Sequence, residues 1–174
     1  MTPVIETARL ALREMSLDDL DFVAAMLAHP EVMRFWPQTY SREEAEFWVR
    51  RQQDRYARDG HGYWLALDKT TGEPVGQAGV LQVQFDGREE PGLGYIIHRP
   101  FWRKGFATEA AAASLQYAFD RLDVPRVVSL IRPENESSLG VARKIGMKEE
   151  DRTEYAGLVH LVYAVSREGA RAER

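Results

Sequence analysis

The sequence contains no cysteine among its 174 residues, which excludes a disulfide framework, a thiolate metal site and a cysteine nucleophile. It also lacks an apolar run of membrane-spanning length. Residues Met1–Glu6 have neither the charged start nor the long apolar stretch of a signal peptide. These absences predict a cytoplasmic protein with no membrane partner and no metal.

An excess of basic charge is missing too. The net charge is −4 and the isoelectric point about 5.6, so a nucleic acid is excluded as the main partner. Hydrophobic residues make up 44% and charged residues 29%, as in ordinary globular proteins. Without repeats or linkers, we expect one domain over residues 1–174, with a frayed tail after about residue 167 because little there can be buried.

Hydrophobic periodicity predicts alternating helices and strands. Ser16 and Ser41 precede helical stripes as N-caps, and Gly60 and Gly146 stand where helices end. The predicted strands are 9–13, 63–67, 75–85, 93–97, 127–131, 147–154 and 158–165, and the predicted helices are 16–29, 41–59, 105–122 and 135–144. The fold class is therefore α/β (α+β mixed), with a curved mixed sheet of six to seven strands and about four helices.

The strongest local signal is the segment from Trp102 to Ala110, which follows a strand and opens a helix. Unpaired amides and the helix dipole make such a helix start attractive to phosphates. Gly105 lets the backbone approach closely, and Arg103 and Lys104 lie at the mouth. These residues predict a diphosphate pocket, although a glycine that only eases the turn is an equal alternative.

Two other phosphate sites are excluded. The chain has no Gly-x-x-x-x-Gly-Lys-Ser/Thr loop. Gly92 and Gly94 begin a dinucleotide-like pattern, but Ile97 occupies its third glycine position and the segment is predicted to be a strand.

Trp102–Ala110 resembles the acetyl-CoA-binding motif of the GNAT acetyltransferases, Gln/Arg-x-x-Gly-x-Gly/Ala. The tryptophan followed by Gly-Phe-Ala-Thr-Glu-Ala is similar to the RimJ/RimL-like branch, whose first glycine is here Arg103. The blocks Asn135–Ser138 and Lys144–Met147 resemble the family's Asn-x-x-Ser/Ala and Lys-x-Gly-Phe signatures. The segment Thr7–Arg13 resembles the branch's opening strand, so the resemblance covers nearly the whole chain.

The resemblance implies that acetyl-CoA lies between two splayed parallel strands, which end near Ile97 and Ile131. It implies that backbone groups of one strand hold the pantetheine and polarise the thioester carbonyl, and that Asn135 bonds the pantetheine arm. The cofactor-binding residues implied are Tyr95, Ile96, Ile97, Arg103, Lys104, Gly105, Phe106, Ala107, Thr108, Asn135 and Ser138.

The acid that protonates the departing thiolate is a tyrosine in many relatives, but Ala142 stands at that position. The serine of Asn-x-x-Ser is the acid proposed for the RimL-like branch, which implies Ser138 as the catalytic residue. The alternative is that Ser138 only caps or packs the helix start.

The general base is left open by the sequence. Gly92 replaces the strand glutamate that the branch often carries, and Glu89 and Glu90 fall in a predicted loop. Histidines have the right pKa range for a base, and a chain of water molecules to solvent is also adequate. The histidine candidates are His61, His98 and His160.

The acceptor groove of the family is lined by the two-helix region, where this chain has Trp36, Pro37, Tyr40 and Trp48. The resemblance implies direct attack of a primary amine on the thioester, with a protein N-terminal α-amine as the acceptor. The alternatives are a small-molecule amine acceptor and a non-catalytic acyl-CoA-binding sensor. The sequence leaves a monomer and a homodimer equally open.

Overall fold

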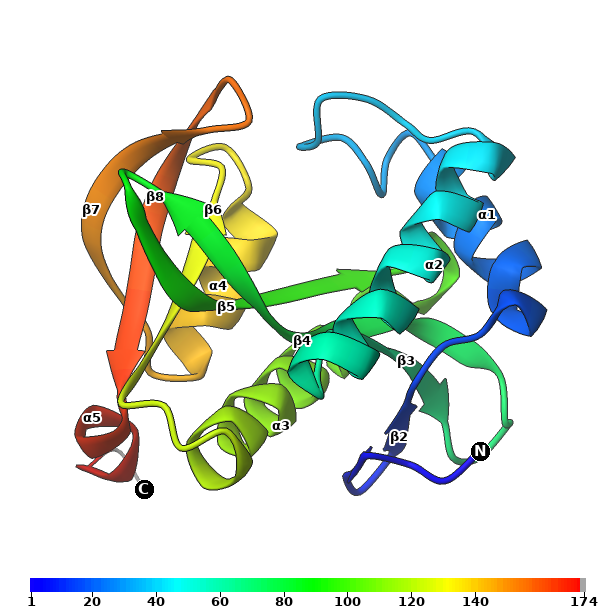
Figure 1. Cartoon of the computed structure of the whole chain (residues 1–174), viewed down its shortest axis with the longest axis horizontal. Coiled ribbons are helices and arrows are strands. Elements are labelled where there is room, and N and C mark those ends of the chain that lie inside the picture. The colour runs from blue at the N-terminus through cyan, green and yellow to red at the C-terminus, as the bar shows by residue number, and fades with distance from the viewer. Residues whose placement is uncertain (173–174) are drawn as a thin grey trace.

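The computed structural model describes residues 1–172 and consists of one eight-stranded sheet with helices on both faces (Figure 1). The strands are β1 (Ile5–Glu6), β2 (Leu10–Arg13), β3 (Tyr63–Asp68), β4 (Pro74–Phe85), β5 (Arg88–Ile97), β6 (Arg126–Ile131), β7 (Lys148–Tyr155) and β8 (Leu158–Ser166). The helices are α1 (Leu20–Ala28), α2 (Arg42–Asp59), α3 (Phe106–Arg121), α4 (Glu136–Lys144) and α5 (Arg167–Ala172), with 3-10 turns at Leu17–Asp19 and Arg99–Phe101.

The predicted mixed sheet is confirmed, in the order β1-β2-β3-β4-β5-β6-β8-β7. The β5–β6 pair is parallel, and its pairing is limited to Gly92 opposite Val128. Beyond this point β5 continues to Ile97 and β6 to Ile131 without pairing to each other. The two strands therefore splay apart as the family resemblance implied.

A side-chain hydrogen bond closes the point of divergence. The Ser129 hydroxyl donates to the Leu93 carbonyl over 3.0 Å. Buried backbone acceptors need a partner, and the serine supplies one where the ladder between the two strands stops.

The helices divide the hydrophobic core into two layers. Helices α3 and α4 pack on one face of the sheet, where Ala111, Leu115 and Leu139 meet residues of β4, β5, β6 and β8. Helices α1 and α2 cover the other face over β3, β4 and β5, through a cluster that includes Val23, Trp48 and Leu65. Neither α1 nor α2 covers the half of that face that is formed by β6, β8 and β7 (Figure 1).

Two elements differ from the sequence-based expectation. Residues Ile5–Glu6 form an additional strand because Thr7 turns the chain back on β2, its hydroxyl accepting from the Leu10 amide over 2.8 Å. Residues 167–172 form α5 because Arg167 is fixed on the loop before β6, through an ion pair with Asp123 at 2.7 Å.

A partly buried carboxylate joins the predicted phosphate motif to the N-terminal segment of the chain. Glu109, in the first turn of α3, accepts from the Thr7 hydroxyl at 2.6 Å, the Arg9 amide at 2.9 Å and the Arg9 Nε at 2.6 Å. Arg9 Nη1 also donates to the Lys104 carbonyl over 2.7 Å. The turn between β1 and β2 thereby fixes the position at which α3 begins.

We predict that Glu109→Gln lowers the free energy of unfolding by about 1–3 kcal/mol at neutral pH, because charge-assisted hydrogen bonds are lost. Burial opposes ionisation of Glu109, but the bonds from Thr7 and Arg9 outweigh it and hold its pKa below the ordinary value. The contribution is therefore present above the unfolded-state pKa and is lost as the pH falls through the lower folded-state pKa.

Urea unfolding between pH 7 and pH 3 measures this effect. The difference between wild type and Glu109→Gln should shrink as the pH falls. Glu73→Gln, which changes an exposed glutamate in the β3–β4 turn, is the control and should differ little from wild type. A pH-independent difference for Glu109→Gln would contradict the prediction.

Candidate functional site

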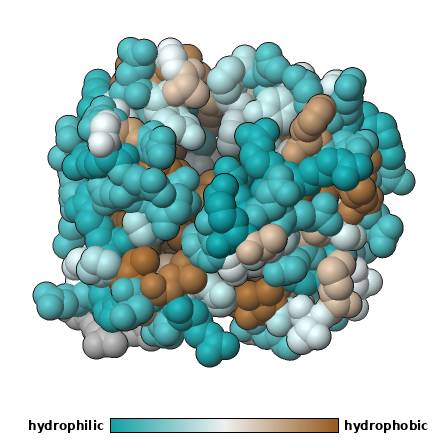
Figure 2. All heavy atoms as spheres, viewed as in Figure 1, coloured by the Kyte–Doolittle hydropathy of each residue, from teal (hydrophilic) through white to brown (hydrophobic). Residues whose placement is uncertain are grey.

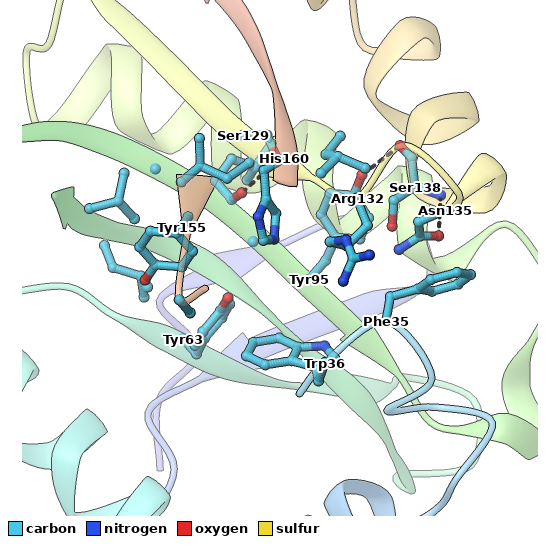
Figure 3. A pocket seen from close by; sticks show the side chains of 18 of the residues that line it. Phe35, Trp36, Tyr63, Tyr95, Ser129, Arg132, Asn135, Ser138, Tyr155 and His160 are labelled. Carbon is cyan, nitrogen blue, oxygen red and sulfur yellow. Dashed lines mark hydrogen bonds between the residues drawn. The ribbon is translucent and has the colours of Figure 1, made fainter. Parts of the chain in front are cut away.

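A cavity of about 340 Å³ opens where β5 and β6 diverge. Strands β7 and β8 and the start of α4 bound it on one side, and α2 and the loop before it bound the other (Figure 3). In the space-filling view the surface is mostly hydrophilic and is hollowed between the two halves of the sheet (Figure 2). The aromatic lining residues are Phe35, Trp36, Tyr40, Trp48, Tyr63, Tyr95 and Tyr155.

The aromatic wall on the α2 side is built around Trp48. Its ring stacks on Tyr63 at 5.7 Å between centroids, and Trp36 and Tyr40 each lie 5.8 Å away. The Trp48 Nε1 donates to Gln77 Oε1 over 3.1 Å, which holds the indole in place. The predicted groove residues Trp36, Pro37, Tyr40 and Trp48 all line the cavity, so Trp48 serves packing and lining together.

The floor of the cavity is formed by glycines of β5. A Cβ atom at Gly94 would lie 2.0 Å from the Tyr63 hydroxyl, so the absent side chain makes room for that ring. Burial raises the pKa of Tyr63 to about 12, which keeps the phenol protonated. A Cβ atom at Gly92 would lie 2.6 Å from a methyl group of Val83, and valine thus occupies the space above that position.

The start of α4 places Asn135 and Ser138 at the cavity edge. Asn135 is the N-cap, because its Oδ1 accepts from the Ser138 amide over 3.1 Å. The alternative in which the Ser138 side chain caps the helix is therefore wrong, and the role of Ser138 as the acid stays a prediction. The Tyr95 hydroxyl crosses the gap between the strands and donates to the Ser138 carbonyl over 2.9 Å (Figure 3).

Of the three candidate histidines, His160 lines the cavity. Its Nδ1 lies 2.8 Å from the Leu158 carbonyl, which can only accept, so Nδ1 carries the hydrogen and Nε2 is left as an acceptor. Burial lowers the pKa of His160, and the positive charge of Arg132 adds to this effect. The imidazole is therefore neutral at physiological pH, as a general base requires.

The other two histidines lie away from the cavity. His61 is buried with its Nδ1 at 2.6 Å from the Val80 carbonyl. His98 packs edge-on against Phe22 and His29. Glu89 and Glu90 lie on β5 rather than in the predicted loop, and Glu90 pairs with Arg126 at 2.8 Å outside the cavity.

The charge of the cavity was not predicted from the sequence. Arg51, Arg55, Arg132 and His160 line it, whereas none of its described lining residues is aspartate or glutamate. Arg51 and Arg55 follow Trp48 by three and seven residues, so helical spacing from Trp48 was the signal that could have found them. Tyr63, Tyr155 and Arg132 come from distant elements, and no local pattern indicated them.

The predicted phosphate loop is a separate feature outside this cavity. Arg103 and Gly105 both have left-handed backbone, with φ of 60° and 81°. No side chain among residues 1–172 caps α3, whereas Ser41 caps α2 and Asn135 caps α4. The first amides of α3, at Phe106, Ala107 and Thr108, are thus left for an external acceptor beside the exposed Arg103 and Lys104.

The backbone of β5 turns alternate groups toward the gap. The His98 amide donates to the Val75 carbonyl of β4 over 2.9 Å, so by alternation Ile96 also faces β4, and Tyr95 and Ile97 face the gap. The Ile97 carbonyl accepts from Trp102 Nε1 over 2.7 Å, which ties the phosphate loop to the end of this strand.

The sheet is thus opened at its parallel pair, with an uncapped helix start and an aromatic cavity beside the opening. Residues 9–148 match the family model described as Acetyltransferase (GNAT) domain. The chain therefore belongs to the GNAT acetyltransferase family and has acyltransferase activity.

Similar proteins agree with this assignment. The uncharacterized protein YkkB of Bacillus subtilis is 34% identical over 142 residues, which cover 81% of this chain and 83% of YkkB. Spermidine N(1)-acetyltransferase of Escherichia coli K12 is 26% identical over 80% of this chain and 73% of its own. The crystal structure of an acetyltransferase from Agrobacterium tumefaciens superposes with a TM-score of 0.83 at 27% identity, covering 96% of both chains.

The described residues contain neither a metal-binding cluster nor a membrane-spanning helix. No group of three or more histidine, aspartate or glutamate side chains in the described part of the chain is placed to hold a metal ion. Within residues 1–172, no helix has the length and apolar character needed to cross a membrane.

Proposed function

We propose that the protein is an acetyl-CoA-dependent N-acetyltransferase of the RimJ/RimL-like branch, in which a primary amine attacks the thioester directly in a ternary complex. The observation that carries this proposal is the splay of β5 and β6 after Gly92 and Val128. It forms a passage between the uncapped start of α3 and the aromatic cavity. Acetyl-CoA supplies the activated acetyl group.

The residues of this chain fit the cosubstrate in three places. The amides of residues 103–108, with the side chains of Arg103 and Lys104, hold the pyrophosphate. The gap-facing backbone of Tyr95 and Ile97 holds the pantetheine and aims an N–H at the thioester oxygen. Asn135 uses its Oδ1 for the cap, and its Nδ2 amino group serves the pantetheine arm.

Two side chains move protons in the proposed reaction. His160 Nε2 accepts the proton that the amine loses, directly or through one water molecule. The Ser138 hydroxyl donates a proton to the leaving sulfur. Both side chains line the same cavity.

The acceptor that the branch resemblance favours is a protein N-terminal α-amine. A small-molecule amine is the second candidate, because the relative from Escherichia coli is named a spermidine N(1)-acetyltransferase. In this proposal either acceptor enters the cavity from the side between α2 and β7.

We predict that calorimetric titration with acetyl-CoA gives a dissociation constant in the micromolar range, and that thiol release depends on an added amine. Gly105→Ala should weaken acetyl-CoA binding about tenfold, because a methyl group at φ 81° lies 3.1 Å from Arg9 Nη2 and shifts the first amides of α3. Gly72→Ala is the matched control, since Gly72 has a φ of 75° and no neighbouring atom within 4 Å.

Both variants place alanine in a left-handed conformation, so each should lose about 1 kcal/mol in the free energy of unfolding. Only Gly105→Ala should change the affinity for acetyl-CoA. No binding of acetyl-CoA to the wild type would refute the assignment of residues 103–108. Binding without release across N-terminal peptides and small amines would refute the amine-transfer step.

A second prediction concerns Ser138. Ser138→Ala should lower kcat about 100-fold or more, as loss of a general acid does, with the KM for acetyl-CoA unchanged. The melting temperature should stay close to that of the wild type, because Asn135 is the capping side chain. Ser137→Ala, an exposed neighbour on the same helix, should leave all three quantities unchanged. Full turnover by Ser138→Ala would show that another group protonates the sulfur.

A third prediction concerns His160. Because burial lowers its pKa, the base form persists into mildly acidic solution, and the acid limb of kcat/KM should lie below about pH 6.5. His160→Gln should lower kcat about 100-fold and remove this limb. His98→Asn is the control, since burial also lowers the pKa of His98 but its ring lies outside the cavity. An unchanged pH profile in His160→Gln would exclude it as the base.

A further inference from the structure

The arginines of α2 fall into two groups. Three of them pair with carboxylates: Arg42 with Asp21 at 2.6 Å, Arg50 with Glu46 at 2.7 Å and Arg58 with Asp59 at 2.6 Å. The other two, Arg51 and Arg55, line the cavity, and neither forms an ion pair with a carboxylate within residues 1–172.

The two unpaired arginines are placed unfavourably for stability alone. They stand four residues apart on one face of α2, where like charges repel each other. Arg55 Nη1 donates to Gln52 Oε1 over 3.2 Å, and the Arg51 guanidinium lies 6.0 Å from the Trp48 ring centre. Burial lowers the pKa of Arg55, and the charges of Arg51 and Arg58 lower it further. A negative charge from outside the chain would relieve this repulsion.

Nothing in the cavity wall supplies that charge. No aspartate or glutamate occurs among its described lining residues. On the opposite wall, Arg132 Nε is buried and has no hydrogen-bond partner, although Arg132 Nη2 lies 3.3 Å from Glu134. The cavity is thus lined by guanidinium groups from α2 and from the segment after β6, where Arg132 lies. Figure 3 shows Arg132 with the aromatic side chains of Phe35, Trp36 and Tyr63.

We propose that Arg51 and Arg55 form an anion subsite of the acceptor groove, so that the enzyme acetylates amines that also carry a carboxylate or phosphate and discriminates against polyamines. The proposal rests on the N-acetyltransferase function proposed above and specifies its acceptor. Arginine favours carboxylate and phosphate because its planar donors match their oxygens in pairs. The apolar part of the acceptor lies against Tyr40 and Trp48.

Two kinds of acceptor carry a carboxylate close to a primary amine. A free amino acid carries its own α-carboxylate beside the amine, and a protein N-terminus carries one where acidic residues follow the first position. A cavity of about 340 Å³ is at the lower end of the range for small-molecule sites, which suits a group of amino-acid size in either case.

The test compares matched acceptors in the thiol-release assay and, in parallel, by calorimetry on the CoA-loaded enzyme. One arm pairs free amino acids with their carboxamides, and a second pairs peptides beginning Ser-Asp-Glu and Ser-Asn-Gln. Spermidine is the cationic probe. The anionic member of at least one pair should have a kcat/KM about 10- to 100-fold above its neutral partner. The arm in which this occurs identifies the source.

Variants of α2 assign the effect to the subsite. Arg51→Gln and Arg55→Gln should each raise the KM for the anionic acceptor about tenfold or more and leave the neutral partner and acetyl-CoA unchanged. Arg55→Glu should reverse the preference toward the cationic probe. Arg58→Gln, which removes the same charge from an exposed and paired position, is the control. It should change neither the KM for the anionic acceptor nor the preference between anionic and cationic amines. Because Arg51 is exposed, Arg51→Gln should fold normally. It therefore tests the subsite even if the Arg55 variants fold poorly.

Three results would overturn the proposal: equal rates for anionic and neutral partners, a preference for spermidine, or a rise in the KM for acetyl-CoA in place of the acceptor. If no amine is acetylated, the proposed function fails and calorimetry decides the subsite separately. Binding of an anionic member that is lost in Arg55→Gln would then support it, and absence of such binding would refute it.

Discussion

The loss of pairing between β5 and β6 is the constraint around which the rest of the molecule is arranged. Backbone groups inside a sheet need partners, yet the pair stops at Gly92 and Val128. Side chains replace part of the missing ladder: Ser129 bonds the Leu93 carbonyl and Trp102 bonds the Ile97 carbonyl. The groups left over at Tyr95 and Ile97 face a gap of the kind that a bound amide chain can complete. The opening is therefore stable without ligand and still able to bind one.

The opening is useful only if the elements on its two sides keep fixed positions. On one side, Glu109 joins the start of α3 to Thr7 and Arg9 in the turn between β1 and β2, which holds the uncapped amides in place for the proposed pyrophosphate contact. On the other side, the Tyr95 hydroxyl holds the Ser138 carbonyl. These contacts join segments about 100 and about 40 residues apart, respectively, so the site depends on the completed fold rather than on any one motif.

Local signals explain which parts of this arrangement could be predicted. The capping box at Ser41 and the left-handed Gly105 and Gly146 depend on a few neighbouring residues, and a sequence contains them directly. The strand at Ile5–Glu6 was missed because two residues are too few for periodicity. Tyr63, Tyr155 and Arg132 were missed because β3, β7 and the end of β6 meet only after the sheet has formed. The alternative of a Ser138 cap was wrong because the choice between Asn135 and Ser138 as the cap depends on side-chain direction rather than on residue type.

The charge of the cavity also bears on how an amine becomes a nucleophile there. Catalysis needs the neutral amine, and most primary amines are protonated at neutral pH. Positive groups nearby disfavour the ammonium form, so Arg51, Arg55 and Arg132 assist deprotonation in the proposed mechanism. In that mechanism a weak base such as His160 suffices, although Val83 fills the space that a side chain at Gly92 would need. The guanidinium groups proposed to select an anionic acceptor would thereby replace part of the work of a carboxylate base.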